Sequence, residues 1–267
     1  MSRLTTQFTT LKNNGRKALV SYVMAGDPAP QVTVPLLHDL VAAGVDVLEI
    51  GLPFSDPMAD GPVIALAAER ALAGGTNTLN VLDMVAEFRK NDNTTPVVLM
   101  GYLNPLEIIG YETFAKRASE SGVDGLLIVD LPPEEVGDLD GILKQYDLDP
   151  IFLLAPTSTD ERIGHVLSQA RGFIYYVSLK GVTGSGALDI TEAAARISKV
   201  KAQTDLPVGV GFGIRDADTA KKMASVADAV IVGSVLVQPF GEQSVEVAHG
   251  MAVEKIKELR AALDELA

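Results

Sequence analysis

The sequence predicts an α/β fold, a single (β/α)8 TIM barrel that spans residues 1–267 and carries an extra N-terminal helix. Eight apolar strand-like runs occur along the chain, helical patterns separate most of them, and no linker rich in Pro, Gly and Ser divides it. Apolar strands that alternate with helices indicate a parallel sheet covered on its outer side. Eight such units in 267 residues fit a closed barrel better than an open sheet.

The elements follow one another in a regular order. Residues 2–13 place Leu4, Phe8 and Leu11 at helical spacing, so we expect a first helix that covers the barrel floor. A last helix carries apolar residues at the same period: Met251, Ile256, Leu259, Leu263 and Leu266. Between these helices the expected strands lie near 18–24, 46–51, 96–101, 124–129, 150–154, 173–177, 207–211 and 228–232.

Capping residues predict where several helices begin and end. Asp27-Pro28 predicts a helix start and Gly44 its left-handed end. Ser158 and Glu161 fit a capping box for a later helix, and Asp216 is the expected cap of another.

The strand entries echo one another. Gly44-Val45-Asp46 and Gly122-Val123-Asp124 each enter an apolar strand, and Ala227-Asp228-Ala229 enters a third. This echo indicates a barrel assembled from repeated units.

Composition narrows the class of function. The formal charge is 22 − 35 = −13, which argues against a nucleic-acid partner or an anionic membrane surface. The chain has no cysteine, which excludes thiolate chemistry, disulfides and thiolate metal sites. Residues 1–8 lack an apolar run of signal-peptide length, and the run from Ala227 to Val237 is too short to span a bilayer. We therefore expect residence in the cytoplasm.

Histidine spacing predicts no metal site. His38, His165 and His249 occur singly in helical patterns, with no ligand-like spacing between them.

Glu49 is the most unusual residue of the sequence. It lies in the apolar run Val45–Leu52, and strand period places it on one face with Val47 and Gly51. A buried carboxylate costs several kcal/mol unless it is paired, so Glu49 serves either chemistry or a buried salt bridge. Eleven residues later, Asp60 precedes a helical run and is either its cap or a second catalytic carboxylate.

Glycine-rich segments end the last three strands, where a barrel of this class commonly binds phosphate. They are residues 181–186, 208–213 and 230–234. Glycines let backbone N–H groups approach an anion closely, although each segment could also be a simple turn.

Together these residues resemble the α subunit of tryptophan synthase over nearly the whole chain. The resemblance rests on four strings in their order: residues 49–57, residues 60–62, Gly181-Val182-Thr183-Gly184 and Gly211-Phe212-Gly213-Ile214. It implies a lyase that cleaves indole-3-glycerol phosphate to indole and glyceraldehyde 3-phosphate by a retro-aldol reaction.

The resemblance also assigns site residues. It implies that Glu49 is the acid/base and that Asp60 lies near the indole nitrogen. It implies an indole pocket of Tyr22, Met100, Tyr175, Thr183 and Phe212, and a phosphate site of Gly184, Gly213, Gly233 and Ser234. In the enteric members the positions of Tyr22 and Met100 are Phe and Leu.

A partner is implied as well. The resemblance implies no cofactor in this subunit and a pyridoxal-phosphate β subunit that receives indole in an α2β2 complex. Candidate contacts are Asp56, Pro57, Asn104-Pro105 and Pro132-Pro133, which the sequence alone would make ordinary loop residues.

Two alternatives stay open on the residues alone. One is another phosphosugar enzyme on the same barrel, such as an isomerase or epimerase. The other is a barrel subunit that is mainly regulatory. Tyr175, on one face with Phe173 and Val177, could likewise be a core residue.

Overall fold

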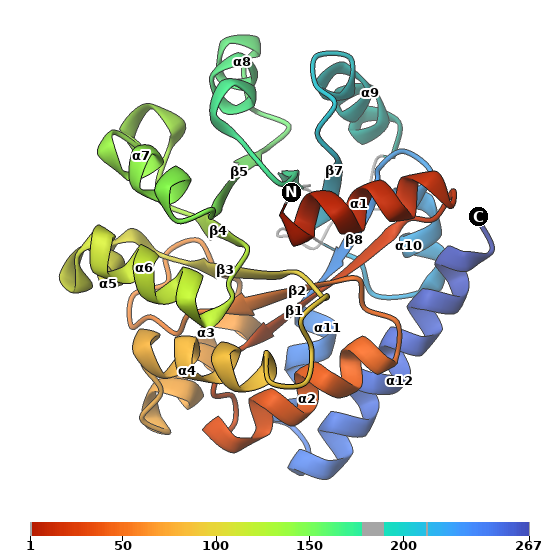
Figure 1. The fold of residues 1–267 in the computed structure, drawn as a ribbon. Coiled ribbons are helices and arrows are strands. Elements are labelled where there is room, and N and C mark those ends of the chain that lie inside the picture. The colour runs from red at the N-terminus through yellow and green to blue at the C-terminus, as the bar shows by residue number, and fades with distance from the viewer. Residues whose placement is uncertain (1, 178–189, 212, 267) are drawn as a thin grey trace.

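The computed structural model describes residues 2–177, 190–211 and 213–266 and forms a closed barrel of parallel strands (Figure 1). The strands pair in sequence order from β1 to β8, and β1 closes the barrel by pairing with β8. The strands are β1 Ala18–Met24, β2 Val47–Gly51, β3 Val97–Gly101, β4 Gly125–Ile128, β5 Asp149–Leu154, β6 Ile174–Val177, β7 Val208–Gly211 and β8 Ala229–Val232. The predicted fold and its eight strands are confirmed.

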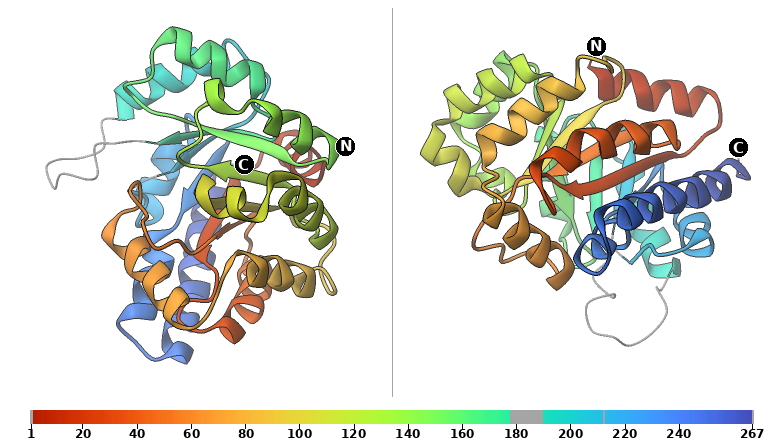
Figure 2. Two further views of the ribbon diagram at one scale, coloured as in Figure 1. Left: turned by 90° about the vertical axis from the view of Figure 1, so that its left-hand side faces the viewer. Right: turned by 90° about the horizontal axis from the view of Figure 1, so that it is seen from below.

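Helices surround the barrel and cover its outer face (Figure 2). Two helices rather than one follow β2, and two follow β3. The helices are α1 Arg3–Asn13, α2 Pro30–Ala42, α3 Pro62–Ala73, α4 Thr78–Phe88, α5 Leu103–Ile109, α6 Tyr111–Ser121, α7 Asp138–Gln145, α8 Asp160–Gln169, α9 Ile190–Lys201, α10 Ala217–Ala224, α11 Ser234–Val237 and α12 Val245–Asp264, with short 3-10 turns η1 Pro133–Glu135 and η3 Gln238–Gly241.

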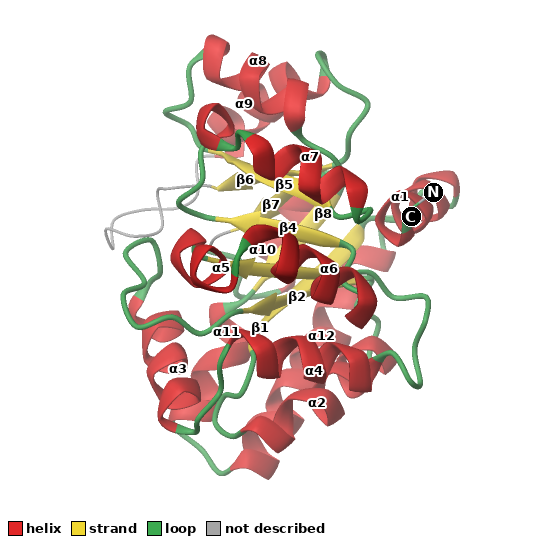
Figure 3. Cartoon of the chain, turned by 60° about the vertical axis from the view of Figure 1, so that its left-hand side comes forward, coloured by secondary structure: helices red, strands yellow, loops and turns green. Residues whose placement is uncertain are grey.

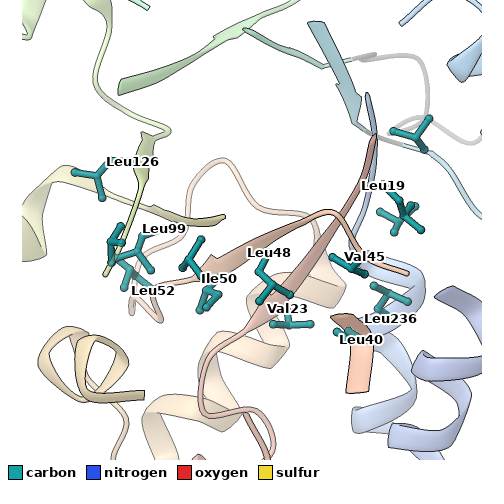
Figure 4. Close-up of a cluster of buried hydrophobic side chains, with 14 of the residues drawn as sticks. Leu19, Val23, Leu40, Val45, Leu48, Ile50, Leu52, Leu99, Leu126 and Leu236 are labelled. Carbon is teal, nitrogen blue, oxygen red and sulfur yellow. The ribbon is translucent and has the colours of Figure 1, made fainter. Parts of the chain in front are cut away.

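Strand alternation divides the apolar residues of β2 between two cores. Leu48 and Ile50 lie in the outer core with Leu19, Leu99 and other residues under the helices (Figure 4). Val47 lies instead in the inner core of the barrel. Because Glu49 follows Val47 by two residues, its side chain shares the inner face. The period-2 prediction for this strand is confirmed.

The N-terminal helix seals the barrel floor, as predicted. Leu4, Phe8 and Leu11 are buried and belong to the inner core, together with residues from the starts of the strands. The ring of Phe8 lies 5.6 Å from the ring of Phe173, which precedes β6. Figure 3 shows α1 at one end of the barrel, so the site must be reached from the other end.

Aspartates at the strand entries tie neighbouring strands together at the floor. Asp46, Asp124 and Asp228 each lie directly before a strand. Their side chains accept the backbone N–H groups of Leu19, Val97 and Val208, each of which is the first or second residue of the preceding strand in the barrel. These bonds measure 2.8, 2.8 and 3.0 Å. The repeated strand entries of the sequence therefore correspond to one repeated hydrogen bond between neighbouring strands.

Each of these carboxylates also has a cationic partner. Arg260 reaches Asp46 at 2.9 Å, and Lys201 reaches Asp228 at 2.6 Å. Asp124 has two partners, Arg89 and Arg3, both at 2.9 Å. Charge pairing and backbone donors together offset the cost of burying Asp46 and Asp124, whereas Asp228 is only partly buried.

Two of the predicted helix caps are wrong. Asp27 does not cap α2, which begins at Pro30, because its carboxylate is held by Arg70 of α3 at 2.7 Å. Thr159 caps α8 in place of Ser158, whose hydroxyl accepts the N–H of Ala155 instead. In both cases a different partner takes the side chain that the local pattern had assigned to the cap.

Other predicted ends are confirmed. Asp216 caps α10 by accepting the N–H of Thr219, and Gly44 has the positive φ of 112° expected just beyond α2. In α12, Ile256, Leu259 and Leu263 are buried, whereas Met251 is exposed; Leu266, which the sequence pattern also assigned to the last helix, lies beyond its end and is exposed. Within the described ranges, the helices are too short or too polar to cross a lipid bilayer.

Candidate active site

Glu49 lies in the middle of β2, on the inner face of the barrel. It pairs in register with Tyr22 of β1 on one side and Val98 of β3 on the other, and it is only 1% exposed. Neither of its carboxyl oxygens has a hydrogen-bond partner among the described residues. The buried salt bridge that the sequence left open is therefore not formed within the described part of the chain. Among the described residues, Glu49 is held in place by its strand and by no charge partner.

Burial changes the acidity of Glu49, because its carboxyl has no hydrogen-bond partner among the described residues to replace the lost water. Desolvation raises its pKa from 4.5 to about 8, because the charged form has lost its water. At neutral pH the group is then mostly a neutral acid that can donate a proton. A group with a pKa near the working pH is suited to general acid and base catalysis.

Asp60 lies in the loop between β2 and α3, at the mouth of the barrel. The first residue before α3 is Gly61, and no side chain caps this helix. The interpretation of Asp60 as a helix cap is therefore wrong. The pKa of Asp60 is raised to about 6, because the effect of burial outweighs the opposing effect of the nearby Tyr102 hydroxyl. With a pKa near 6 on Asp60 and near 8 on Glu49, the two groups differ in charge at pH 7.

Tyr102 is a site residue that the sequence analysis missed. It directly follows β3, two residues beyond Met100, and it is buried. Its hydroxyl accepts the N–H of Ala59, the residue before Asp60, at 2.9 Å. A signal was present, because period 2 from Met100 places Tyr102 on the inner face at the carboxyl end of a barrel strand.

Three residues predicted for the indole pocket come together on the inner face. Tyr22 and Tyr175 lie close enough to Glu49 that its charge raises the pKa of both phenols, after burial itself. Met100 packs on the inner core and also on the cluster that contains Tyr22. These side chains form an aromatic and apolar surround for the carboxyl of Glu49.

Gly51 leaves the space that the side chain of Tyr22 occupies. A Cβ at Gly51 would lie 2.2 Å from the hydroxyl oxygen of Tyr22, which is too close for any side chain. Glycine is therefore required at this point of β2 for the phenol to extend across the strand.

The glycines predicted for phosphate binding lie at the exits of β7 and β8. These strands are neighbours, and β8 also pairs with β1. Gly213 has a φ of 78°, which favours glycine, and Gly233 immediately precedes α11, whose first residue Ser234 is exposed. A Cβ on Gly233 would lie 3.3 Å from the Cβ of Tyr22, so this corner adjoins the aromatic surround.

Three predicted site residues cannot be placed. Thr183, Gly184 and Phe212 lie outside the described residues.

The histidines have ordinary neighbours. The ring of His38 lies 4.7 Å from that of Phe88, while His249 and His165 contact the carboxylates of Asp39 and Glu134. No group of three or more His, Asp or Glu side chains within residues 2–177, 190–211 and 213–266 is arranged to hold a metal ion.

A closed barrel of parallel strands with two carboxyl groups of raised pKa toward its mouth has the architecture of the TIM-barrel class, whose enzymes place their sites at the carboxyl ends of the strands. The family model "Tryptophan synthase alpha chain" matches residues 8–265. The chain belongs to the tryptophan synthase alpha chain family, and it is a lyase that catalyses the α reaction of tryptophan biosynthesis.

Individual relatives agree with the family model. The tryptophan synthase alpha chains of Acinetobacter baumannii and Acinetobacter baylyi are each 70% identical to the chain over 266 residues, with 100% of both chains covered. A crystal structure of tryptophan synthase subunit alpha from Legionella pneumophila superposes with a TM-score of 0.93 at 44% identity, covering 99% of each chain.

Proposed function

We propose that Glu49 and Asp60 carry out the retro-aldol cleavage of indole-3-glycerol phosphate to indole and glyceraldehyde 3-phosphate. The observation that carries this assignment is the carboxyl of Glu49, buried on the inner face of the barrel without a partner among the described residues. Perturbed acids of this kind concentrate at functional sites. The family of the chain defines the reaction, and the two carboxyls supply the proton chemistry that it needs.

The first step protonates the indole ring. Neutral Glu49 donates its proton to C3, the π electrons of the C2–C3 bond form the new C–H bond, and the lone pair of N1 forms a double bond to C2. Positive charge thus develops at N1. The carboxylate of Asp60, with a pKa near 6, is ionised at neutral pH and stabilises this cation.

The second step breaks the carbon–carbon bond. Glu49, now a carboxylate, removes the proton of the neighbouring hydroxyl of the glycerol chain. The O–H electrons form the carbonyl of glyceraldehyde 3-phosphate, and the C3–carbon bond breaks. Its electron pair restores the C2–C3 double bond of indole, while the π electrons of the C2–N1 double bond return to N1 as a lone pair and neutralise its charge. Glu49 ends the cycle protonated, so no external acid or base is consumed.

The remaining residues position the substrate in this proposal. Tyr22, Met100 and Tyr175 enclose the indole ring, and residues Gly213, Gly233 and Ser234 receive the phosphate. The position of α11 supports this, because the first N–H groups of a helix have no intrahelical acceptor. Backbone donors are suited to a chain whose net charge of −13 would otherwise repel a phosphate.

The proposal includes a partner and a compartment. We infer that this subunit needs no cofactor of its own and delivers indole to a pyridoxal-phosphate β subunit in an α2β2 complex. Exposed side chains on the loop after β2 and on α5 after β3 support a docking face there, among them Asp56, Met58, Asn104 and Ile108. A phosphorylated substrate does not cross bilayers freely, which favours the cytoplasm as the place of reaction.

An assay of indole release tests the function. The purified chain is incubated with indole-3-glycerol phosphate, alone and with a tryptophan synthase β subunit. We expect indole in both cases and more of it with the β subunit. A barrel retained only for regulation would release indole in neither case, and a sugar-phosphate isomerase would convert sugar phosphates but not this substrate.

A further inference from the structure

We propose that Arg70 and Asp27 form a positioning pair that keeps the two halves of the substrate site at a fixed separation. One half is Asp60, which lies just before the start of α3, and the other is the corner at the start of α11 that is proposed to bind the phosphate. The inference rests on the function proposed above. It follows from the position of α3, which packs against β1, α11 and η3.

The ion pair joins α3 to the loop after β1. Nε of Arg70 donates to one carboxylate oxygen of Asp27 at 2.7 Å, and Nη2 donates to the other oxygen at 2.8 Å. The side chain of Asp27 is only 2% exposed, and that of Arg70 is 29% exposed. Two parallel hydrogen bonds to one carboxylate fix the orientation of a guanidinium as well as its distance. The pair therefore holds α3 at a defined position relative to this loop.

The loop that carries Asp27 is itself closely packed. The N–H of Gly26 donates to the hydroxyl of Thr33 in α2 at 2.9 Å. A Cβ on Gly26 would lie 2.0 Å from the hydroxyl oxygen of Thr76, and the φ of this glycine is 82°. No side chain fits between the loop and the segment that follows α3. Asp27 therefore projects from a loop that is fixed on both sides.

The same guanidinium lies against η3. A Cβ on Gly241, the last residue of η3, would lie 2.9 Å from Nη1 of Arg70. The turn η3 follows α11 without a break, because α11 ends at Val237 and η3 begins at Gln238. One guanidinium thus contacts the loop after β1 and the segment after α11 at once.

The buried face of α3 contacts the site directly. It lies in one apolar cluster with Tyr22 and Val237 through three small residues, Ala67, Ala68 and Ala71. An alanine has no side-chain torsion that could compensate for a displaced helix, and close-packed interiors transmit such displacements. A movement of α3 would therefore shift the loop before it relative to both Tyr22 and α11.

The test replaces Arg70 by lysine, which keeps the positive charge and removes the planar pair of donors. Because the charge remains, a change in binding reports geometry and not long-range attraction of the phosphate. The matched control is Arg89→Lys at the floor, since Arg89 also pairs with a buried carboxylate, that of Asp124 at 2.9 Å. Urea unfolding measures the loss of stability in both variants.

Three ligands separate the spacing of the two halves from binding at either half. Indole occupies one half of the site and glycerol 3-phosphate the other. Indole-3-propanol phosphate spans both halves and cannot be cleaved, because it lacks the hydroxyl that the second step deprotonates. NMR titration gives the three dissociation constants, and indole release from indole-3-glycerol phosphate gives kcat and KM.

We expect Arg70→Lys to bind indole and glycerol 3-phosphate as the wild type does. Its affinity for indole-3-propanol phosphate and its kcat/KM should fall by about ten- to a hundredfold, because only a ligand that joins the two halves depends on their spacing. Arg89→Lys should lose stability and keep all three affinities.

An unchanged affinity of Arg70→Lys for indole-3-propanol phosphate would overturn the proposal. So would an equal fall for glycerol 3-phosphate alone, which would mean that Arg70 acts on the phosphate corner itself. The same changes in Arg89→Lys would reduce the effect to lost stability. If Arg70→Lys does not fold, Asp27→Asn replaces one of the two accepting oxygens by a donor, and the same comparisons apply. A wild-type protein that binds none of the three ligands and releases no indole would instead refute the proposed function.

Discussion

Buried carboxyl groups have opposite surroundings at the floor of the barrel, which α1 covers, and toward the mouth, where the strands end. At the floor, Asp46 accepts the N–H of Leu19 and the guanidinium of Arg260. Burial raises its pKa, and these partners act in the other direction. At the mouth, Glu49 is as deeply buried, yet within the described residues no donor or cation opposes the shift. Asp46 directly precedes β2 and Glu49 lies within it, so the two groups are only three residues apart.

This contrast shows what each region contributes. A buried carboxylate with donors and a cation joins strands and stabilises the fold, since removing it would leave those partners unsatisfied. A buried carboxyl without them adds little to stability but has a pKa suited to proton transfer at neutral pH. The same chemical group therefore supports the fold at one end of the barrel and the reaction at the other.

The largest effect is expected for Glu49→Gln. The amide keeps the shape of the side chain but transfers no proton, so indole release should fall by about 10²–10⁴-fold, roughly 3–5 kcal/mol of barrier. Folding and ligand affinity should persist. Steady-state indole release, together with ligand binding by calorimetry, measures both. Wild-type turnover would exclude the acid/base role of Glu49.

Asp124→Asn should show the reverse pattern. It leaves Arg89 and Arg3 without their carboxylate at the buried floor, and loss of one member of a buried pair costs about 3–5 kcal/mol of unfolding free energy. Activity per folded molecule should stay near wild type, because the mouth is untouched. Urea unfolding followed by circular dichroism gives the stability change.

A surface pair provides the control for that experiment. Asp83 contacts Arg117 at 2.7 Å, with side chains that are 66% and 40% exposed. Asp83→Asn should cost no more than about 1 kcal/mol. Equal losses for the two variants would show that the floor carboxylates have no special structural role.

Asp60→Asn should reduce activity less than the change at Glu49. It replaces a charge-assisted interaction with N1 by a neutral one, which is worth about 1.5–3 kcal/mol, or roughly ten- to a hundredfold. The same indole assay measures it. If Asp60→Asn proved the more damaging of the two, the division of roles between the carboxyls would be the wrong way round.

Asp216→Ala should have the smallest effect. Asp216 is an exposed side chain that caps α10, and loss of such a cap costs about 1 kcal/mol of stability. Urea unfolding should detect this loss, while indole release from the folded protein should stay close to wild type. A large loss of activity at the folded plateau would mean that this cap also supports the nearby site at the mouth.

The sequence predicted the fold because its signals are local and repeated. Apolar runs at period 2 located β1 through β8 to within a residue or two, and helical spacing located α1 on the floor. The caps at Asp27 and Ser158 were mispredicted because competing partners took those side chains. The partner of Asp27 is Arg70, 43 residues away, and a pairing of that separation has no local signature.

The site was predictable to a similar depth. Period 2 placed Glu49 on the inner face, and the direction of its pKa shift followed from burial alone. The choice between cap and carboxylate at Asp60 needed the start of α3 in three dimensions. Tyr102 escaped notice because its significance lies in a contact with a loop 43 residues earlier, at Ala59, the residue before Asp60.

Glu49, which has no hydrogen-bond partner among the described residues, also makes the free energy of unfolding depend on pH. The pKa of Glu49 is raised from 4.5 to about 8, so between these values the folded chain binds more protons than the unfolded chain. Stability should therefore fall as pH rises through this window. Removing the carboxyl in Glu49→Gln should lessen that fall, and the stability of the two proteins should converge toward pH 4.5.

Titration of Glu49 itself is the most direct test of the contrast between floor and mouth. Carboxyl ¹³C NMR of the folded protein, with Glu49→Gln to assign the signal, reports the ionisation of this one group. The account predicts a midpoint near pH 8. A midpoint near 4.5 would mean that Glu49 is solvated or paired like the floor aspartates, and the central claim would be wrong.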